Sequence, residues 1–167
     1  MLSGRFGNTT GRPYLEALVI LPRLKIESGV SFLVDTGADQ TVLMPVDAIK
    51  MGINYARLVS APSPLTGIGG ECNSFSESAV IVLADDTSRK LFAYKINILI
   101  ADKKAANQAY CPSLLGRDIL NKLRIKYDFH KKKILFSLTS ADLIVPLDKF
   151  ASKRVRTKIK KLRNLPE

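Results

Sequence analysis

Short apolar runs alternate with polar turns along most of the chain, and this pattern predicts a mainly β protein. The runs have the length of strands, and Gly, Pro, Asp and Ser gather between them. Apolar positions with helical spacing are fewer and predict short helices at 44–52 and 117–123. Strands are expected at 14–20, 30–34, 54–61, 75–83, 90–101, 125–129 and 134–138.

The same pattern divides the 167 residues into three parts. Residues 1–12 are rich in Gly, Thr, Asn and Arg, and we expect a flexible, poorly ordered segment there. Residues 13–148 carry the expected strands and are enough to bury a core without disulfides or metals. Residues 149–167 form a tail with one apolar face, because their apolar positions are four, four and three residues apart. Those positions are Ala151, Val155, Ile159 and Leu162.

Charge also separates this tail from the rest of the chain. The formal net charge is +11 at pH 7, and from residue 149 onward there are eight basic side chains and one acidic. The basic stretch Lys153–Arg163 leaves two interpretations open. One is weak contact with nucleic acid or an anionic membrane surface. The other, which we prefer, is a solvated tail or a helix that packs on its own domain through Val155, Ile159 and Leu162.

The composition excludes several kinds of site. Two cysteines, Cys72 and Cys111, are too few for a disulfide framework, and with the single histidine, His130, they cannot build a Cys/His metal cluster. His130 stands beside three lysines, which indicates a solvated turn rather than a catalytic base. We therefore expect no metal and no cofactor.

The sequence carries no sign of a membrane segment or of export. No apolar run reaches the roughly 18 residues that a membrane helix needs. The first residues lack the apolar centre of a signal peptide. We expect a cytoplasmic protein.

The stretch 32–43 is the strongest candidate for chemistry. An apolar run leads to Asp35-Thr36-Gly37, and the chain then returns to β-branched and apolar residues. A carboxylate between two hydrophobic runs is costly to bury, and a catalytic role would explain why it is there. A simple turn between two strands would explain the same residues. The stretch alone does not decide between them.

Two further motifs follow in order, and together with the first they carry a resemblance. The three are Leu33-Val34-Asp35-Thr36-Gly37-Ala38-Asp39-Gln40-Thr41-Val42, Thr66-Gly67-Ile68-Gly69-Gly70 and Leu114-Leu115-Gly116-Arg117-Asp118-Ile119-Leu120. At these separations the chain resembles the retroviral-type aspartic proteases, or retropepsins, and within them the cellular or bacterial branch. The resemblance implies a single-domain, closed β fold with short helices, equivalent to half of a pepsin. It places the active site on the axis of a homodimer.

The resemblance also implies roles for residues around the first motif. Asp35 would be the catalytic carboxylate, and Thr36 would hydrogen-bond across the dimer axis. Gly37 would let the substrate backbone approach closely. Leu115 and Gly116 would pack under the active-site loop.

Substrate binding is implied for a second group of residues. Asp39 would accept hydrogen bonds from substrate N–H groups and would pair with Arg117. A flexible flap would hold a water molecule against substrate carbonyl groups. The flap residues are Gly67, Ile68 and Gly69. The pocket walls are expected to include Val42, Leu43, Ile68 and residues of the loop 102–113.

The chemistry itself requires two copies of the chain. Peptide hydrolysis by carboxylates needs two of them beside one water, one to accept its proton and one to polarise the carbonyl. The chain holds one Asp-Thr-Gly, and Asp86-Thr87-Ser88 lacks the glycine. We therefore expect an aspartic endopeptidase acting on polypeptides as a homodimer. The alternative is a catalytically silent dimerisation or peptide-binding module.

The chain departs from the viral proteases it resembles after the helix. In the viral dimers the N- and C-terminal strands interleave soon after the helix, whereas this chain continues through a hairpin at 125–138. We expect that hairpin to contribute to closing the dimer. Ala38 cannot donate a hydrogen bond to the carboxylate, as Ser or Thr can in pepsin-like enzymes, so we expect a less acidic working range than that of pepsin.

Overall fold

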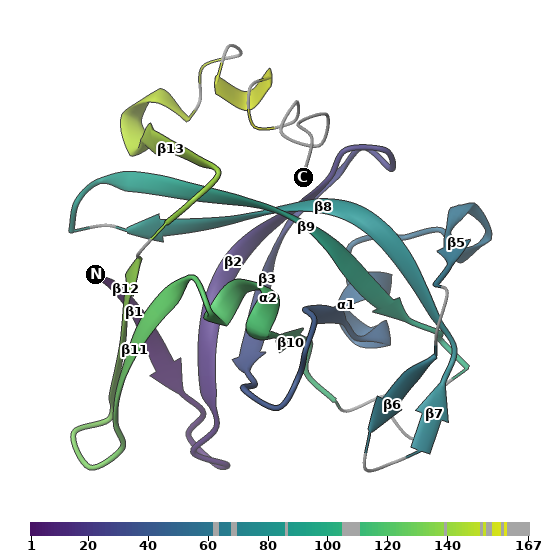
Figure 1. Cartoon of the computed structure of the whole chain (residues 1–167), viewed down its shortest axis with the longest axis horizontal. Helices are drawn as coiled ribbons and strands as arrows, with labels where there is room; N and C mark the ends of the chain where they lie inside the picture. Colours follow the sequence, from purple (N-terminus) through teal and green to yellow (C-terminus); the bar gives the residue numbers. More distant parts are fainter. Residues whose placement is uncertain are drawn as a thin grey trace.

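Long strands that curl around a shared apolar core make up most of the computed structural model (Figure 1). The structure describes residues 1–61, 64–67, 70–85, 87–104, 111–138, 140–150, 152, 155–157 and 159. The fold is a mostly-β single domain, as the sequence predicts. The longer strands are β1 (Leu2–Phe6), β2 (Pro13–Leu21), β3 (Ile26–Val34), β8 (Ser74–Asp85), β9 (Lys90–Ala101), β11 (Leu123–Asp128) and β12 (Lys133–Leu138).

Shorter elements connect these strands. The short strands are β4 (Val42–Leu43), β5 (Val59–Ser60), β6 (Leu65–Gly67), β7 (Gly70–Cys72), β10 (Leu114–Leu115) and β13 (Leu143–Pro146). The helices are α1 (Pro45–Lys50), α2 (Arg117–Leu120) and the 3-10 turns η1 (Tyr55–Arg57) and η3 (Leu147–Lys149). Within the described part of the chain, no helix has the length and apolar character needed to cross a membrane.

One large sheet contains β1, from the N-terminal part of the chain, and β13, from its C-terminal part, together with most of the strands between them. Its strand order is β11-β12-β1-β2-β3-β10-β4-β9-β8-β5, with β13 beside β9 and a further pairing of β2 with β8, while β6 and β7 form a separate hairpin. The short strand β10 lies between β3 and β4, parallel to the first and antiparallel to the second. A segment about 80 residues further along the chain is thereby inserted directly behind the end of β3.

Strand β8 is buried on both faces, which explains its nearly continuous apolar sequence. Ala79, Ile81 and Leu83 point into the main core, where the fully buried Phe32, Ile98 and Phe136 also lie. Val80 and Val82 point to the opposite face and pack in a second cluster. That cluster is covered by residues from the C-terminal part of the chain, namely Val145, Phe150, Val155 and Ile159.

The described part of the tail packs on its own domain. Ile159 is completely buried and Val155 is partly buried in the second cluster. Arg156 forms an ion pair with Glu27 and lies over the ring of Phe150. These contacts agree with the preferred interpretation for residues 155–157 and 159. Leu162 and Ala151 lie outside the described residues, as does most of Lys153–Arg163.

Three sequence expectations need correction. Residues 2–6 are not a flexible segment: they form β1, between β12 and β2, and Leu2 is buried. The stretch 54–61 forms η1 and the short β5 instead of one strand, because the Asn54 side chain accepts a hydrogen bond from the Ala56 N–H. Helix α2 ends at Leu120, and Leu123 already pairs with Leu138 in β11.

The remaining expected elements are present. β2, β3, β8, β9 and the hairpin of β11 and β12 cover the strands expected in those regions. Helix α1 has Pro45 in its first turn, and Gly52 adopts a φ of +72° just beyond its end. That left-handed conformation favours glycine, as the sequence pattern predicts.

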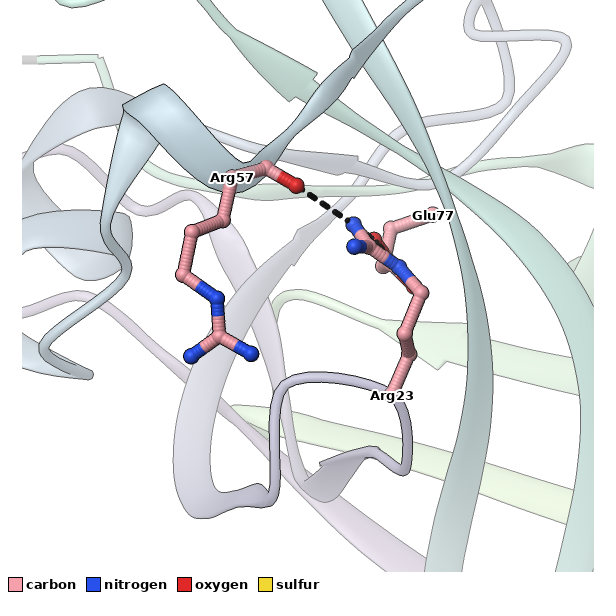
Figure 2. A network of polar contacts seen from close by, with 3 residues as sticks. All are labelled: Arg23, Arg57 and Glu77. Atoms are coloured by element: carbon pink, nitrogen blue, oxygen red, sulfur yellow. Dashed lines mark hydrogen bonds and ion pairs between the residues drawn. The ribbon is translucent and has the colours of Figure 1, made fainter.

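Arg23, in the turn after β2, is bonded to the buried Glu77 of β8 and to Arg57 of η1 (Figure 2). The Nε–H of Arg23 donates to both carboxylate oxygens of Glu77, each at 3.0 Å, and Nη2 donates to the carbonyl oxygen of Arg57 at 2.9 Å. Glu77 is only 4% exposed, so the guanidinium offsets the cost of burying its charge. The hydrogen bond to Glu77 also raises the pKa of Arg23.

A second buried carboxylate anchors the start of β1. Asp85 is 5% exposed and accepts hydrogen bonds from the N-terminal ammonium group of Met1 at 2.8 Å and from the Thr87 N–H at 2.9 Å. Burial raises the pKa of this carboxyl, but hydrogen bonds from the ammonium group and from Ser88 outweigh burial and lower the pKa to about 2. The charged form of Asp85 therefore stabilises the folded state.

We predict that Asp85→Asn lowers the free energy of unfolding by about 1–2 kcal/mol at pH 7, because hydrogen bonds to a charged acceptor are lost. The pKa of Asp85 is lower in the folded than in the unfolded state. Its contribution is therefore complete above about pH 4 and is lost as the pH falls toward 2. Urea unfolding across this range measures the effect. The difference in free energy of unfolding between wild type and Asp85→Asn should shrink as the pH falls. Asp148→Asn, at an exposed residue, serves as the control. A difference that does not depend on pH would contradict this assignment.

Candidate active site

The loop that follows β3 presents Asp35 at the end of a buried strand. The Gly37 N–H donates to Asp35 Oδ1 at 2.9 Å, and the Ala38 N–H donates to the Asp35 carbonyl oxygen at 3.3 Å. These bonds fold residues 35–38 into a turn and orient the carboxylate. Asp35 is partly exposed, while Thr36 and Gly37 are exposed. In the single chain this loop therefore has one face open to solvent.

Strand β10 supports this loop from behind. The Asp35 N–H donates to the Leu115 carbonyl oxygen at 3.1 Å, and the Leu33 N–H donates to the Ser113 carbonyl oxygen at 2.8 Å. Leu115 is completely buried in the main core. The structure thus brings Asp35 and Leu115 together, as expected from the sequence.

Position 116 requires glycine because there is no room for a side chain, and not because of its backbone conformation. Its φ is −89°, which any residue can adopt. A Cβ atom at this position would lie 2.3 Å from the carbonyl carbon and 2.4 Å from the carbonyl oxygen of Gln40. The backbone of the active-site loop therefore passes directly over Gly116, and a larger residue would displace it.

Thr41 and Asp118 join the loop to the start of α2, and the sequence analysis assigned no role to either. The Thr41 hydroxyl donates to Asp118 Oδ1 at 2.7 Å and accepts a hydrogen bond from the Gly116 N–H at 3.2 Å. The Thr41 N–H donates to Asp118 Oδ2 at 3.0 Å. Thr41 is completely buried. A polar residue just before the buried Val42 was the signal that could have revealed this contact.

Backbone bonds and an ion pair complete the same junction. The Arg117 N–H donates to the Ala38 carbonyl oxygen at 2.9 Å, and the Asp118 N–H donates to the Asp39 carbonyl oxygen at 3.2 Å. The expected ion pair between the Asp39 and Arg117 side chains is present. Both side chains are largely exposed, so this pair adds little to stability, and the buried Thr41 contacts hold the loop.

Ser113 provides another link that the sequence analysis missed. Its hydroxyl donates to Asp47 Oδ2 at 2.6 Å and accepts a hydrogen bond from the Met44 N–H at 3.0 Å. Ser113 is completely buried. Helix α1 is thereby fixed to the strand that carries Leu115.

A cleft of about 630 Å³ opens beside Asp35. The active-site loop forms one wall, and the β6 end of the hairpin contributes Pro64, Leu65 and Thr66. Val42, Leu99 and Leu114 add apolar surface. The cleft thus combines two carboxylates, the partly exposed Asp35 and the exposed Asp39, with several apolar side chains. Its lining residues are Asp35, Gly37, Ala38, Asp39, Gln40, Val42, Pro64, Leu65, Thr66, Leu99 and Leu114.

The expected pocket walls are found only in part. Val42 lines the cleft, but Leu43 does not, because its side chain alternates to the opposite face of β4 and is fully buried in the core. Ile68 and Gly69 of the flap and residues 105–110 of the neighbouring loop lie outside the described residues. Gly67 ends β6 and pairs with Gly70, which has a φ of +98°, so the expected hairpin is present up to its tip.

The other polar candidates do not gather at the cleft. Thr87 and Ser88 lie in the turn between β8 and β9, far along the sheet from β10, and Asp86 is outside the described residues. Cys72 and Cys111 form no disulfide with each other. In the described part of the chain, no three His, Cys, Asp or Glu side chains are grouped so as to bind a metal ion.

Comparison with solved structures supports the fold. The chain is similar to a retropepsin-like aspartic protease from Rickettsia conorii, with 22% identity and a TM-score of 0.54, over 79% of this chain and 96% of that one. It is also similar to the EIAV protease in complex with the inhibitor HBY-793, with 24% identity and a TM-score of 0.47, over 69% of this chain and 90% of that one. Comparison with curated protein sequences gives no significant match.

Comparison with protein families gives the identity of the domain. The retroviral aspartyl protease family matches residues 11–127, which is more than half of the chain. The matched region contains the loop at Asp35, the β6–β7 hairpin and the β10–α2 junction. The chain therefore belongs to the retroviral aspartyl protease family.

Proposed function

We propose that this protein is an aspartic endopeptidase whose catalytic carboxylate is Asp35. The observation that carries the proposal is the position of Asp35, partly exposed at the wall of an apolar cleft and oriented by the Gly37 N–H. Membership of the retroviral aspartyl protease family supports the same reaction. A turn residue with no other role would not need the buried contacts that hold this loop to β10 and α2.

The proposed reaction uses two Asp35 carboxylates, one from each subunit of a homodimer. Two carboxylates about 3 Å apart cannot both be ionised, so the pair shares one proton. The ionised carboxylate accepts a proton from the attacking water, and the protonated one polarises the carbonyl of the scissile peptide bond. The single Asp-Thr-Gly in this chain is the reason for placing the second carboxylate in another copy. Thr36, exposed beside Asp35, would contact the partner loop.

The proposed substrate is an extended polypeptide lying across the cleft. The exposed Asp39 carboxylate is positioned to accept hydrogen bonds from substrate N–H groups. Gly37 leaves room for the substrate backbone, and the flap at Gly67, Ile68 and Gly69 would close over it. The apolar lining from Val42, Leu65 and Leu99 favours apolar side chains beside the scissile bond.

We predict that Asp35→Asn lowers peptidase activity by at least about a hundredfold while leaving the fold unchanged, because the amide cannot accept the proton from water. Cleavage of a denatured protein, followed by mass spectrometry, measures the loss. Asp148→Asn, outside the cleft, should retain activity. If the wild-type protein binds peptides but cleaves none, the domain is a silent binding module and the proposal is wrong.

Ala38→Ser should shift the acidic limb of the pH–activity profile to lower pH. A hydroxyl at this position can hydrogen-bond the carboxylate and favour its ionised form, which alanine cannot do. The profile of kcat/KM against pH measures the shift. Two superimposable acidic limbs, or a wild-type optimum as acidic as that of pepsin, would contradict the role assigned to Ala38.

Thr41→Val should destabilise the protein by about 1–3 kcal/mol and reduce activity, because the Gly116 N–H and the Asp118 carboxylate both lose a buried partner. Thr41→Ser keeps the hydroxyl and should restore both properties to near the wild-type level. Urea unfolding and peptide cleavage are measured on the same preparations. Equal losses in the two variants would mean that the methyl group matters rather than the hydrogen bonds.

A further inference from the structure

A second cavity, of about 350 Å³, lies at the base of the β6–β7 hairpin. Its walls come from the end of β5 and the residues after it, from the start of β8, and from Asp102 just after β9. Figure 1 shows these elements together on one side of the molecule. Of the described lining residues, only Pro64 also lines the cleft at Asp35, so the proposed function gives this cavity no role. Its lining residues are Ser60, Ala61, Pro64, Asn73, Ser74, Phe75 and Asp102.

The hydroxyl group of Ser74 is buried at the wall of this cavity without a partner. Ser74 is 5% exposed, and its Oγ atom forms no hydrogen bond in the described part of the chain. An unpaired polar atom that is shielded from water costs free energy, and buried hydroxyl groups in folded proteins are usually bonded. The Ser74 hydroxyl is therefore a group that a ligand entering the cavity can pair with.

The backbone around the cavity is already bonded to itself. The Ala61 N–H donates to the Ser74 carbonyl oxygen at 2.9 Å, and the Asp102 N–H donates to the Asn73 carbonyl oxygen at 2.9 Å. These bonds fix the two ends of the β6–β7 hairpin to the end of β9. They leave side chains as the polar groups that a ligand would meet.

Asp102 gives the cavity a negative charge. Its Oδ1 atom accepts a hydrogen bond from the Lys104 N–H at 3.0 Å, whereas Oδ2 has no partner among the described residues. The neighbouring Lys103 does not neutralise it, because its Nζ atom lies over the ring of Tyr55, 5.8 Å from the centroid. Burial raises the pKa of Tyr55, and the negative charge of Asp102 raises it further. The cavity thus holds a carboxylate that can still accept hydrogen bonds.

We propose that this cavity binds an arginine side chain of a polypeptide. An ionised carboxylate only accepts hydrogen bonds, and the side chains of Ser74 and Asn73 can accept them as well. Acceptors on different strands suit the five N–H donors of a guanidinium group better than the single ammonium group of lysine. Phe75 and Pro64 provide apolar surface for the aliphatic part of the arginine. The site lies outside the cleft and does not require Asp35 to be catalytic.

Titration of the full chain with acetyl-arginine-methylamide, followed in two-dimensional amide NMR spectra, tests the proposal. We expect chemical-shift changes centred on the amides of Ser74 and Asp102, without comparable changes at Asp35. Acetyl-citrulline-methylamide has nearly the same shape but no charge. It should bind at least about tenfold more weakly, because the charge-assisted hydrogen bonds to Asp102 are lost.

Three variants separate binding from structure. Asp102→Asn should weaken binding of the arginine probe by about tenfold or more. Ser74→Ala should also weaken binding, yet leave thermal stability unchanged or higher, because it removes an unpaired buried polar atom. A purely structural Ser74 would give a less stable variant with unchanged affinity. Glu71→Gln, which removes an exposed carboxylate of the same hairpin outside the cavity, serves as the matched control and should bind like wild type.

The outcomes separate this site from the proposed function. Equal affinity for the two probes, shift changes confined to the cleft, or unchanged affinity in Asp102→Asn would each overturn the arginine site. The titration is repeated on Asp35→Asn, which should bind the arginine probe like wild type. A wild-type protein that binds the probe at Ser74 but cleaves no peptide would support this site and contradict the proposed function.

Discussion

The position of Asp35 depends on a short strand from a distant part of the sequence. The Leu115 carbonyl oxygen of β10 accepts a hydrogen bond from the Asp35 N–H. Because Gly116 has no side chain, the loop backbone at Gln40 occupies the space where a Cβ atom would otherwise lie. The next residues, at the start of α2, bind the other end of the loop through Thr41. β10 and the start of α2 together fix both ends of the loop, so the site is as much a product of residues 113–118 as of residues 35–41.

The C-terminal part of the chain covers a second apolar cluster, on the face of β8 and β9 that points away from the main core. β8 and β9 carry apolar residues on both faces, and one face packs in the main core. β13, Phe150 and Ile159 cover the other. Within the described residues 155–157 and 159, Val155 and Ile159 pack in this cluster while Arg156 stays at the surface, which is a structural reason for the alternation of apolar and basic residues there.

The sequence was sufficient for the strands with long apolar runs, for the loop at Asp35, for the junction at 114–120 and for the β6–β7 hairpin up to Gly67 and Gly70. These rest on local patterns: the run before Asp35, the glycines of the hairpin and the spacing within 114–120. It was not sufficient for η1, for the end of α2 or for β1. η1 depends on the local bond from the Ala56 N–H to the Asn54 side chain, a turn signal that the expectation of one strand at 54–61 overlooked. β1 and the strand that begins at Leu123, just after α2, depend on partners that are distant in the chain, and no local pattern records such partners. Thr41 and Ser113 were missed for the same reason, since a buried hydroxyl is recognised only when its acceptor is known.

The pairing of β1 within its own chain has a consequence for the order of events during assembly. When the terminal strands of two chains interleave, neither sheet is complete until the chains meet, and folding and association are one process. Here β1 lies between β12 and β2 of the same chain. The ammonium group of Met1, just before β1, donates a hydrogen bond to Asp85. The subunit can therefore complete its described core alone. In the proposed homodimer, association would then be a separate, second-order step, so the concentration of the chain, rather than its folding, would determine when two Asp35 side chains come together.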